Sequence, residues 1–100
     1  MNIVKIVHGK VELRKDTGSL ISTMGNGDAV DANIKNDGTL IVITTVKGKV
    51  ELRKSSGSLI TTMGNGDAIG ASFTGNDISV KIKNGKVEIR KESGSLIRTI

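Results

Sequence analysis

Two copies of a Gly-Asn-Gly-Asp sequence are the part of this chain most suggestive of chemistry. They lie at Gly25–Asp28 and Gly64–Asp67, and they begin like the glycine-rich loop that binds a dinucleotide. Such a loop needs a third glycine at the right spacing and a following helix whose N-terminus faces the phosphate. Neither copy has these features, so we expect the glycines to supply positive φ in a connection and the aspartate to cap the turn.

The other candidate groups for catalysis or metal binding are few. His8 is the single histidine, and it occupies a turn position at which two related segments carry Lys47 and Asn84. A calcium loop would need oxygen ligands on one loop, but the candidate oxygens straddle an expected strand: Asp28, Asp31, Asn33 and Asp37. No pair of acids or Ser-His-Asp set can be identified. The sequence therefore predicts no enzyme activity, no metal site and no cofactor.

Composition limits the class of protein. The chain has 100 residues, a net charge of +5, no cysteine or proline, and Phe73 as its single aromatic residue. We expect one small domain with an aliphatic core. No apolar run is long enough to cross a membrane, and the N-terminal residues do not form a signal peptide. A soluble protein of the cytoplasm or of a virion is expected.

The chain contains nearly three copies of one repeat. The sequence Gly-Lys-Val-Glu-Leu-Arg-Lys at Gly9–Lys15 recurs at Gly48–Lys54 and, with isoleucine for leucine, at Gly85–Lys91. The copies start 39 and then 37 residues apart, and the difference falls in the turn around Asp37. A fixed period of this length is typical of repeat architectures.

Each repeat has the pattern of four strands joined by tight turns. Leu40–Val46 is β-branched and nearly all apolar, which suits a strand covered on both faces, whereas Val50–Arg53 alternates, which suits one wet face. Between them, Lys47-Gly48 predicts a two-residue hairpin with positive φ at the glycine. The expected strands are A (Asp28–Lys35 and Asp67–Thr74), B (Asn2–Val7, Thr39–Val46 and Asp77–Lys83), C (Lys49–Lys54 and Lys86–Lys91) and D (Ser58–Met63 and Ser95–Ile100).

This four-strand unit resembles a blade of a WD40-type or related β-propeller. The last unit shows it best, from Gly66-Asp67-Ala68-Ile69 to Gly94-Ser95-Leu96-Ile97, although Leu-Arg-Lys stands where the family has its Trp-Asp pair. The resemblance implies an all-β fold of four-stranded antiparallel blades, about 2.75 per chain. The expected division is a partial blade (strands B, C and D) at residues 1–24 and full blades at 25–63 and 64–100. A β-solenoid or a β-sandwich is the alternative, and the repeats also resemble short repeat proteins of bacteria and phages.

The basic charge is carried by the repeat itself. Nine of the fifteen Lys and Arg residues belong to the repeated heptapeptide. The glutamate and arginine side chains of each heptapeptide are expected to face water. A solvated strand face and a polyanion-binding surface are both open interpretations. The residues concerned are Lys10, Arg14, Lys15, Lys49, Arg53, Lys54, Lys86, Arg90 and Lys91.

The strand count predicts an assembly. Eleven strands fall one A strand short of three blades, whereas closed propellers usually have about four to eight blades. Apolar faces left open at both ends would mark an interface. We therefore expect a non-enzymatic structural or protein-interaction module, such as a phage or bacterial accessory protein, that forms a ring as a homodimer or, second, as a trimer. Another protein could be a further partner, and the alternative is a ring that binds a polyanion or a glycan; nucleic acid is a weak candidate and no membrane partner is expected.

Overall fold

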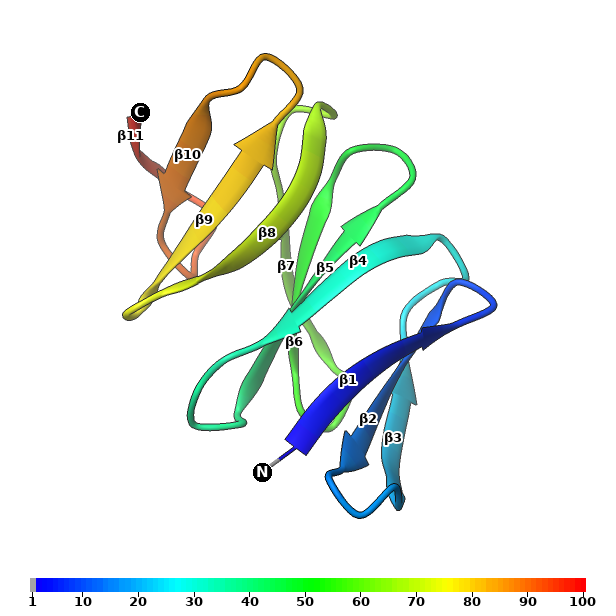
Figure 1. The fold of residues 1–100 in the computed structure, drawn as a ribbon. Helices are drawn as coiled ribbons and strands as arrows, with labels where there is room; N and C mark the ends of the chain where they lie inside the picture. Colours follow the sequence, from blue (N-terminus) through cyan, green and yellow to red (C-terminus); the bar gives the residue numbers. More distant parts are fainter. Residues whose placement is uncertain (1) are drawn as a thin grey trace.

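Eleven antiparallel strands form the structure, a computed structural model that describes residues 2–100 (Figure 1). The first sheet has the strand order β1-β2-β3, the second β4-β5-β6-β7 and the third β8-β9-β10-β11. The strands are β1 (Asn2–Val7), β2 (Lys10–Lys15), β3 (Leu20–Met24), β4 (Ala29–Ile34), β5 (Leu40–Thr45), β6 (Val50–Lys54), β7 (Leu59–Met63), β8 (Ala68–Thr74), β9 (Asp77–Ile82), β10 (Val87–Arg90) and β11 (Leu96–Thr99). The predicted all-β fold of antiparallel blades is confirmed, with one three-stranded and two four-stranded sheets within residues 2–100.

The three sheets stack face to face, with two apolar layers between them. Val11 and Leu13 of the first sheet pack with Ile41 and Ile43 of the second. On the opposite face of the second sheet, the layer against the third sheet contains Val42, Val50, Leu52, Met63, Ala68, Ala71, Ile78, Val80 and Ile82. Successive residues of a strand point to opposite faces, so the apolar run of β5 supplies both layers. The expectation of a strand covered on both faces is confirmed there.

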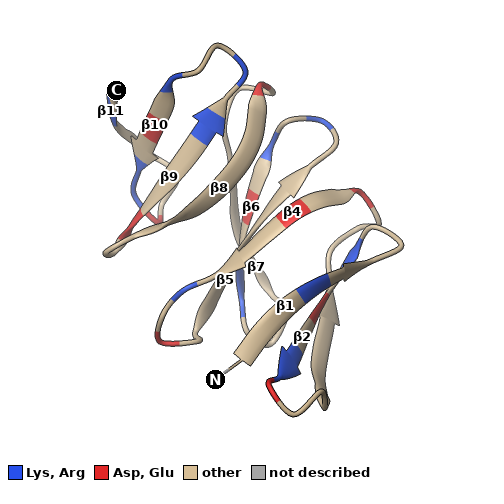
Figure 2. Cartoon of the chain, viewed as in Figure 1, with Lys and Arg blue, Asp and Glu red and all other residues tan. Residues whose placement is uncertain are grey.

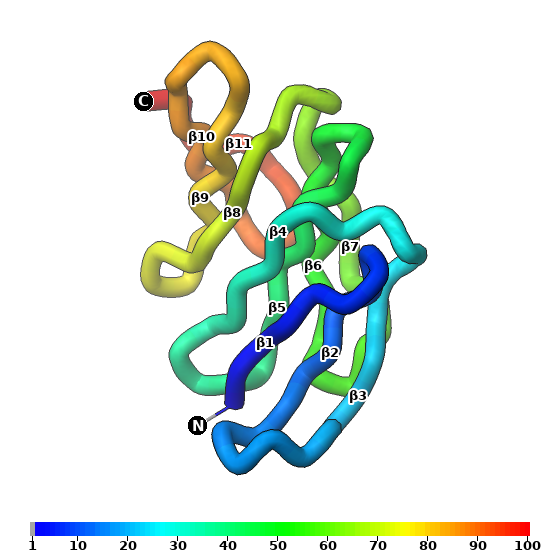
Figure 3. The backbone as a smooth tube through the Cα atoms, turned by 45° about the vertical axis from the view of Figure 1, so that its right-hand side comes forward, coloured from blue at the N-terminus to red at the C-terminus, as the bar shows by residue number. Residues whose placement is uncertain are grey.

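The innermost strands of the three sheets lie side by side. Figures 1 and 3 show β4 between β1 and β8, and β4 contacts both of them. In the second and third sheets this position belongs to strand A, whereas in the first sheet it belongs to strand B. Within residues 2–100, the structure contains no helix that could cross a membrane.

The B–C turns confirm the predicted glycine conformation and correct the predicted loop length. Gly9, Gly48 and Gly85 have φ of 77°, 77° and 87°. The first turn has two residues, His8 (φ 52°) and Gly9. The prediction of two-residue loops is wrong for the other two turns. There the glycine amide donates to the carbonyl three residues earlier, and the loop is one residue longer, with the glycine forming a bulge.

The shorter first turn changes the register of β1 by one residue. Val4 pairs with Leu13, whereas Val42 pairs with the equivalent Leu52. Residue n of β1 therefore corresponds to residue n + 38 of β5, although the turn glycines Gly9 and Gly48 are 39 apart. Because a shift of one residue exchanges the two faces of a strand, this register decides which β1 side chains face the second sheet.

Candidate interaction surfaces

Each C strand carries the same pair of ionised side chains, two residues apart. In each sheet the arginine Nε donates to the glutamate Oε1, and the arginine Nη1 donates to a glycine carbonyl of the following turn. The N–O distances within the pairs are 2.9 Å for Glu12–Arg14, 3.0 Å for Glu51–Arg53 and 3.0 Å for Glu88–Arg90. Each arginine thus has charged and neutral acceptors within its own sheet.

The prediction that these pairs face water is wrong for the second and third sheets. Glu51 and Glu88 are only 6% and 5% exposed, because the neighbouring sheet covers this face. Asn26, from the connection between the first and second sheets, donates through Nδ2 to Glu51 Oε2 at 3.3 Å. A buried charge is tolerated when it is paired and hydrogen-bonded, and here both conditions are met. The alternating pattern of the C strand therefore marks an interface between sheets and not a wet face.

The basic residues proposed for a polyanion surface have different environments. The three arginines are in the ion pairs described above, and Lys10 Nζ and Lys49 Nζ donate to the carbonyls of Gly25 (3.0 Å) and Gly64 (2.8 Å). Figure 2 shows the Lys and Arg positions at several separate places on the three sheets. The residues of this set that are exposed, with no side-chain hydrogen bond described here, are Lys15, Lys54, Lys86 and Lys91.

The two Gly-Asn-Gly-Asp sequences join one sheet to the next. The amide of Ala29 donates to the Gly9 carbonyl at 2.9 Å, and the amide of Ala68 donates to the Gly48 carbonyl at 3.0 Å. A Cβ atom on Gly9 would lie 2.1 Å from the Gly27 carbonyl oxygen. The connection therefore packs directly on the preceding B–C turn, as a structural element that holds two sheets together.

The candidate metal ligands do not come together. Within residues 2–100, no group of three His, Cys, Asp or Glu side chains could share a metal ion. Asn33 Nδ2 donates to the Ala71 carbonyl at 2.6 Å, which joins β4 to β8. Asp37 accepts hydrogen bonds from the Thr39 hydroxyl (2.6 Å) and the Thr39 amide (3.0 Å), and these hold the pKa of Asp37 below its usual range. His8 lies in the exposed β1–β2 turn.

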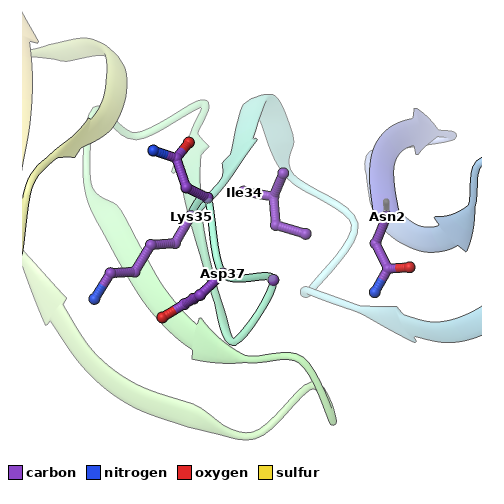
Figure 4. A pocket seen from close by; sticks show the side chains of 6 residues that line it. Asn2, Ile34, Lys35 and Asp37 are labelled. Atoms are coloured by element: carbon purple, nitrogen blue, oxygen red, sulfur yellow. The ribbon is translucent and has the colours of Figure 1, made fainter.

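A pocket of about 590 Å³ opens between the start of β1 and the β4–β5 turn. Figure 4 shows Ile34 between Asn2 on one side and the Lys35 and Asp37 side chains on the other. Asn36 and Gly38 complete the lining. The pocket combines an apolar wall with both signs of charge, at the end of the first sheet, which has no strand A among residues 2–100.

Within residues 2–100, no other sheet covers the outer faces of the first and third sheets. The first presents Ile3, Lys5 and the Glu12–Arg14 pair, whose side chains are 18% and 31% exposed. On the third, the register places Ser79, Lys81, Val87 and Ile89 on the side away from the second sheet. Sequence reasoning predicted that open faces exist but did not predict which side chains form them. The one-residue shift of β1 is the missing signal, and only the pairing shows it.

Comparisons with solved structures place this fold among known architectures. BamB from Moraxella catarrhalis is similar over 99% of this chain and 32% of its own, with a TM-score of 0.81 and 17% identity. Sqt1 from Saccharomyces cerevisiae is similar over 92% of this chain and 27% of its own, with a TM-score of 0.75 and 16% identity. The Pan2 WD40 domain from Neurospora crassa is similar over 99% of this chain and 32% of its own, with a TM-score of 0.74 and 11% identity.

These comparisons identify the architecture of the chain. No protein-family model and no curated protein sequence matches it. The chain spans about a third of the length of the similar structures, all of which have β-propeller folds. Its sheets have the antiparallel strand order expected for propeller blades. The fold of this chain is that of consecutive β-propeller blades.

Proposed function

We propose that this protein is a non-enzymatic interaction module whose copies associate through the outer faces of the first and third sheets. The observation that carries the proposal is that these faces retain side chains equivalent to those that meet inside the molecule. The Glu12–Arg14 pair has the geometry of the buried Glu51–Arg53 pair. It stays partly exposed because no sheet within residues 2–100 covers it.

Apolar side chains also remain on both faces. Ile3 is 46% exposed on the first sheet, at the position that Ile41 occupies in the second. On the third sheet, Val87 corresponds to the buried Val50 and is half-buried, whereas Ile89, which corresponds to Leu52, is already only 8% exposed. Burying such side chains against a second copy is favourable by about 25 cal/mol per Å² of apolar surface. A partner could therefore cover the exposed Ile3 on the first face and the half-buried Val87 on the third.

The charges on the two faces are complementary. The outward positions of β9 hold Asp77 and Lys81, where β5 has Leu40 and Thr44. Lys81 lies toward the B–C turn, as Glu12 does on the first sheet, and Asp77 and Arg14 lie toward the opposite end. If the third sheet of one copy stacked on the first sheet of another as the internal sheets stack, Lys81 would face Glu12 and Asp77 would face Arg14. This arrangement favours a second copy over an unrelated surface.

Two copies would close a ring of six sheets, within the range of about four to eight blades of closed propellers. Two-fold symmetry would cover both outer faces of both copies at once and leave nothing to extend a filament. A homodimer is therefore the assembly that we propose. A trimer, with nine sheets, is the second candidate.

Light scattering coupled to size-exclusion chromatography tests this proposal. The expected mass is twice the chain mass of 10.5 kDa. Lys81→Glu should favour dissociation by opposing Glu12, and Glu12→Lys in the same chain should restore association. Lys47→Glu, at an exposed lysine of the β5–β6 turn, is the matched control and should not change the mass. A monomer at every concentration would overturn the proposal, and three times the chain mass would replace the dimer by the trimer.

A further inference from the structure

The free edge of β1 is a feature that self-association through the sheet faces does not use. β1 is the first strand of the three-stranded sheet, and its one hydrogen-bonded neighbour within residues 2–100 is β2. The corresponding strands β5 and β9 each have a second neighbour, β4 and β8. An unpaired strand edge is a template for an added strand, because its amides and carbonyls have no partner in the sheet.

The backbone groups that point to this edge can be identified from the second sheet. The Val46 amide donates to the Asp28 carbonyl, and the Lys35 amide donates to the Leu40 carbonyl. Residues 40, 42, 44 and 46 therefore face β4, because the pattern alternates along an antiparallel strand. With the shift of 38, the corresponding residues of β1 are at positions 2, 4, 6 and 8. The backbones of Val4 and Ile6 thus face the free edge.

The space beside the β1 edge is bounded by β4. β1 contacts β4 as β5 contacts β8, so a strand added at the β1 edge would lie beside β1 and alongside β4, as β4 lies beside β5 and alongside β8. The 590 Å³ pocket between Asn2 and the β4–β5 turn lies at one end of this position. A strand paired with β1 would therefore lie alongside β4 and end at the pocket.

The side chain opposite Lys5 is the most informative position. Lys5 corresponds to Ile43, which pairs with Ala32 in the second sheet. Lys5 is exposed, on the outer face beside Glu12. An acidic residue opposite Lys5 would form a cross-strand pair of opposite charge, whereas a basic residue would be repelled. The first charged position of the added strand is therefore acidic.

The contacts between β4 and β8 define the other positions of the added strand. Asn33 pairs with Val42 and donates to the Ala71 carbonyl, so an asparagine opposite Val4 could donate to β4 in the same way. Asp31 lies against Gly70, where a Cβ would be 3.5 Å from the Asp31 carboxylate. Asp31 holds the place in β4 that Gly70 holds in β8. The added residue opposite Ile6 would therefore lie against the Asp31 carboxylate, as Asp31 lies against Gly70. It must be small and not acidic.

The last two positions of the added strand lead into the pocket. Ile34 pairs with Ile41, so an apolar residue fits opposite Ile3. Lys35 follows it and reaches Asn76 Oδ1 at 3.3 Å and Glu92 Oε2 at 3.4 Å on the third sheet. A lysine at this place in the added strand would enter the pocket beside the Asp37 carboxylate, whose pKa the Thr39 hydrogen bonds hold below its usual range. From the residue opposite Ile6 to the pocket, the full pattern is small, acidic, Asn, apolar, Lys.

We propose that the β1 edge binds an extended segment of another protein with this pattern, as the innermost strand of the first sheet. The proposal is independent of self-association, because β1 and β4 of one chain form the whole site. Charge favours a different protein over a second copy. The chain's own segment Ala29–Lys35 has alanine where the site requires an acid, and it has Asp31 where an acid would meet a carboxylate.

The test is fluorescence anisotropy with a labelled peptide, Gly-Asp-Ala-Val-Ser-Glu-Asn-Ile-Lys. We expect saturable binding, and we expect about threefold to tenfold weaker binding when lysine replaces the glutamate, from the sign of one cross-strand charge pair. Lys5→Glu should reverse this order of the two peptides. Because a charge reversal at an exposed position leaves the backbone unchanged, this exchange separates pairing at Lys5 from a loss of folding.

A second variant tests the strand pairing itself. Ile6→Pro removes an amide that faces the free edge and no amide that pairs with β2, so the far-UV circular dichroism should persist while peptide binding is lost. No binding of the acidic peptide to folded protein, or equal affinity for both peptides, would overturn the proposal. Tighter binding of a peptide copying Ala29–Lys35 would assign the edge to a second copy and also overturn it. These peptide-binding outcomes do not depend on the mass measured by light scattering.

Discussion

Replacing Gly48 with alanine should cost much more stability than the same replacement at Gly85. The two glycines occupy the same place in successive repeats and have similar φ, 77° and 87°. Their surroundings differ. A Cβ on Gly48 would lie 2.2 Å from the Gly66 carbonyl oxygen and 2.9 Å from the Asp67 amide nitrogen, whereas a Cβ on Gly85 would meet nothing within 4 Å.

The magnitudes follow from these two contributions. A left-handed conformation costs an L-residue about 1–2 kcal/mol, and this part is shared by both variants. The overlap at Gly48 is with backbone, which cannot rotate away, so the connection between the second and third sheets must move. Overpacking of this kind costs a further ~1–3 kcal/mol. We therefore expect Gly85→Ala to lower the free energy of unfolding by about 1 kcal/mol and Gly48→Ala by about 3 kcal/mol.

Urea unfolding followed by circular dichroism measures both values. Gly9→Ala should behave like Gly48→Ala, because its Cβ would also meet the next connection, at 2.1 Å from the Gly27 carbonyl oxygen. Equal losses at Gly48 and Gly85 would refute the reasoning. They would mean that the close approach between turn and connection contributes nothing beyond the φ of the glycine.

Three further predictions concern single side chains. In urea, Glu51→Ala should lower the free energy of unfolding by about 3 kcal/mol, because it leaves the largely buried Arg53 without its carboxylate partner. Glu12→Ala, in the partly exposed pair, should lower it by less than about 1 kcal/mol. Equal losses would contradict the burial assigned to Glu51. Thr44→Val should raise the thermal midpoint, with a gain of about 1 kcal/mol, since the Thr44 hydroxyl is buried with no hydrogen-bond partner within the described residues; a loss would show that the hydroxyl is satisfied. Replacing Lys15, Lys54 and Lys91 together by glutamine should leave the melting temperature nearly unchanged, because all three side chains are exposed. The same change should weaken retention on a heparin column. A large drop in melting temperature would show that these lysines are structural.

The repeat made most of the fold predictable from sequence. Three copies of one heptapeptide and their glycine turns indicate four-stranded antiparallel units, because turns with positive φ and β-branched runs are local properties. The absence of a helix after each Gly-Asn-Gly-Asp sequence likewise indicates a connection and not a phosphate site. Positive φ at Gly48 and two covered faces for β5 are local or patterning statements, and both are confirmed.

The tertiary structure alone decided which faces are buried and which edge is free. The alternation of Val50, Glu51, Leu52 and Arg53 is the same for a wet face and for an interface that contains an ion pair, and only the neighbouring sheet distinguishes them. One residue fewer in the β1–β2 turn shifts the pairing of β1 and places Lys5 on the outer face. The sequence determines each strand and turn because those interactions are local. The open faces and the free edge depend on pairing between strands and on packing between sheets, which involve residues distant in the chain.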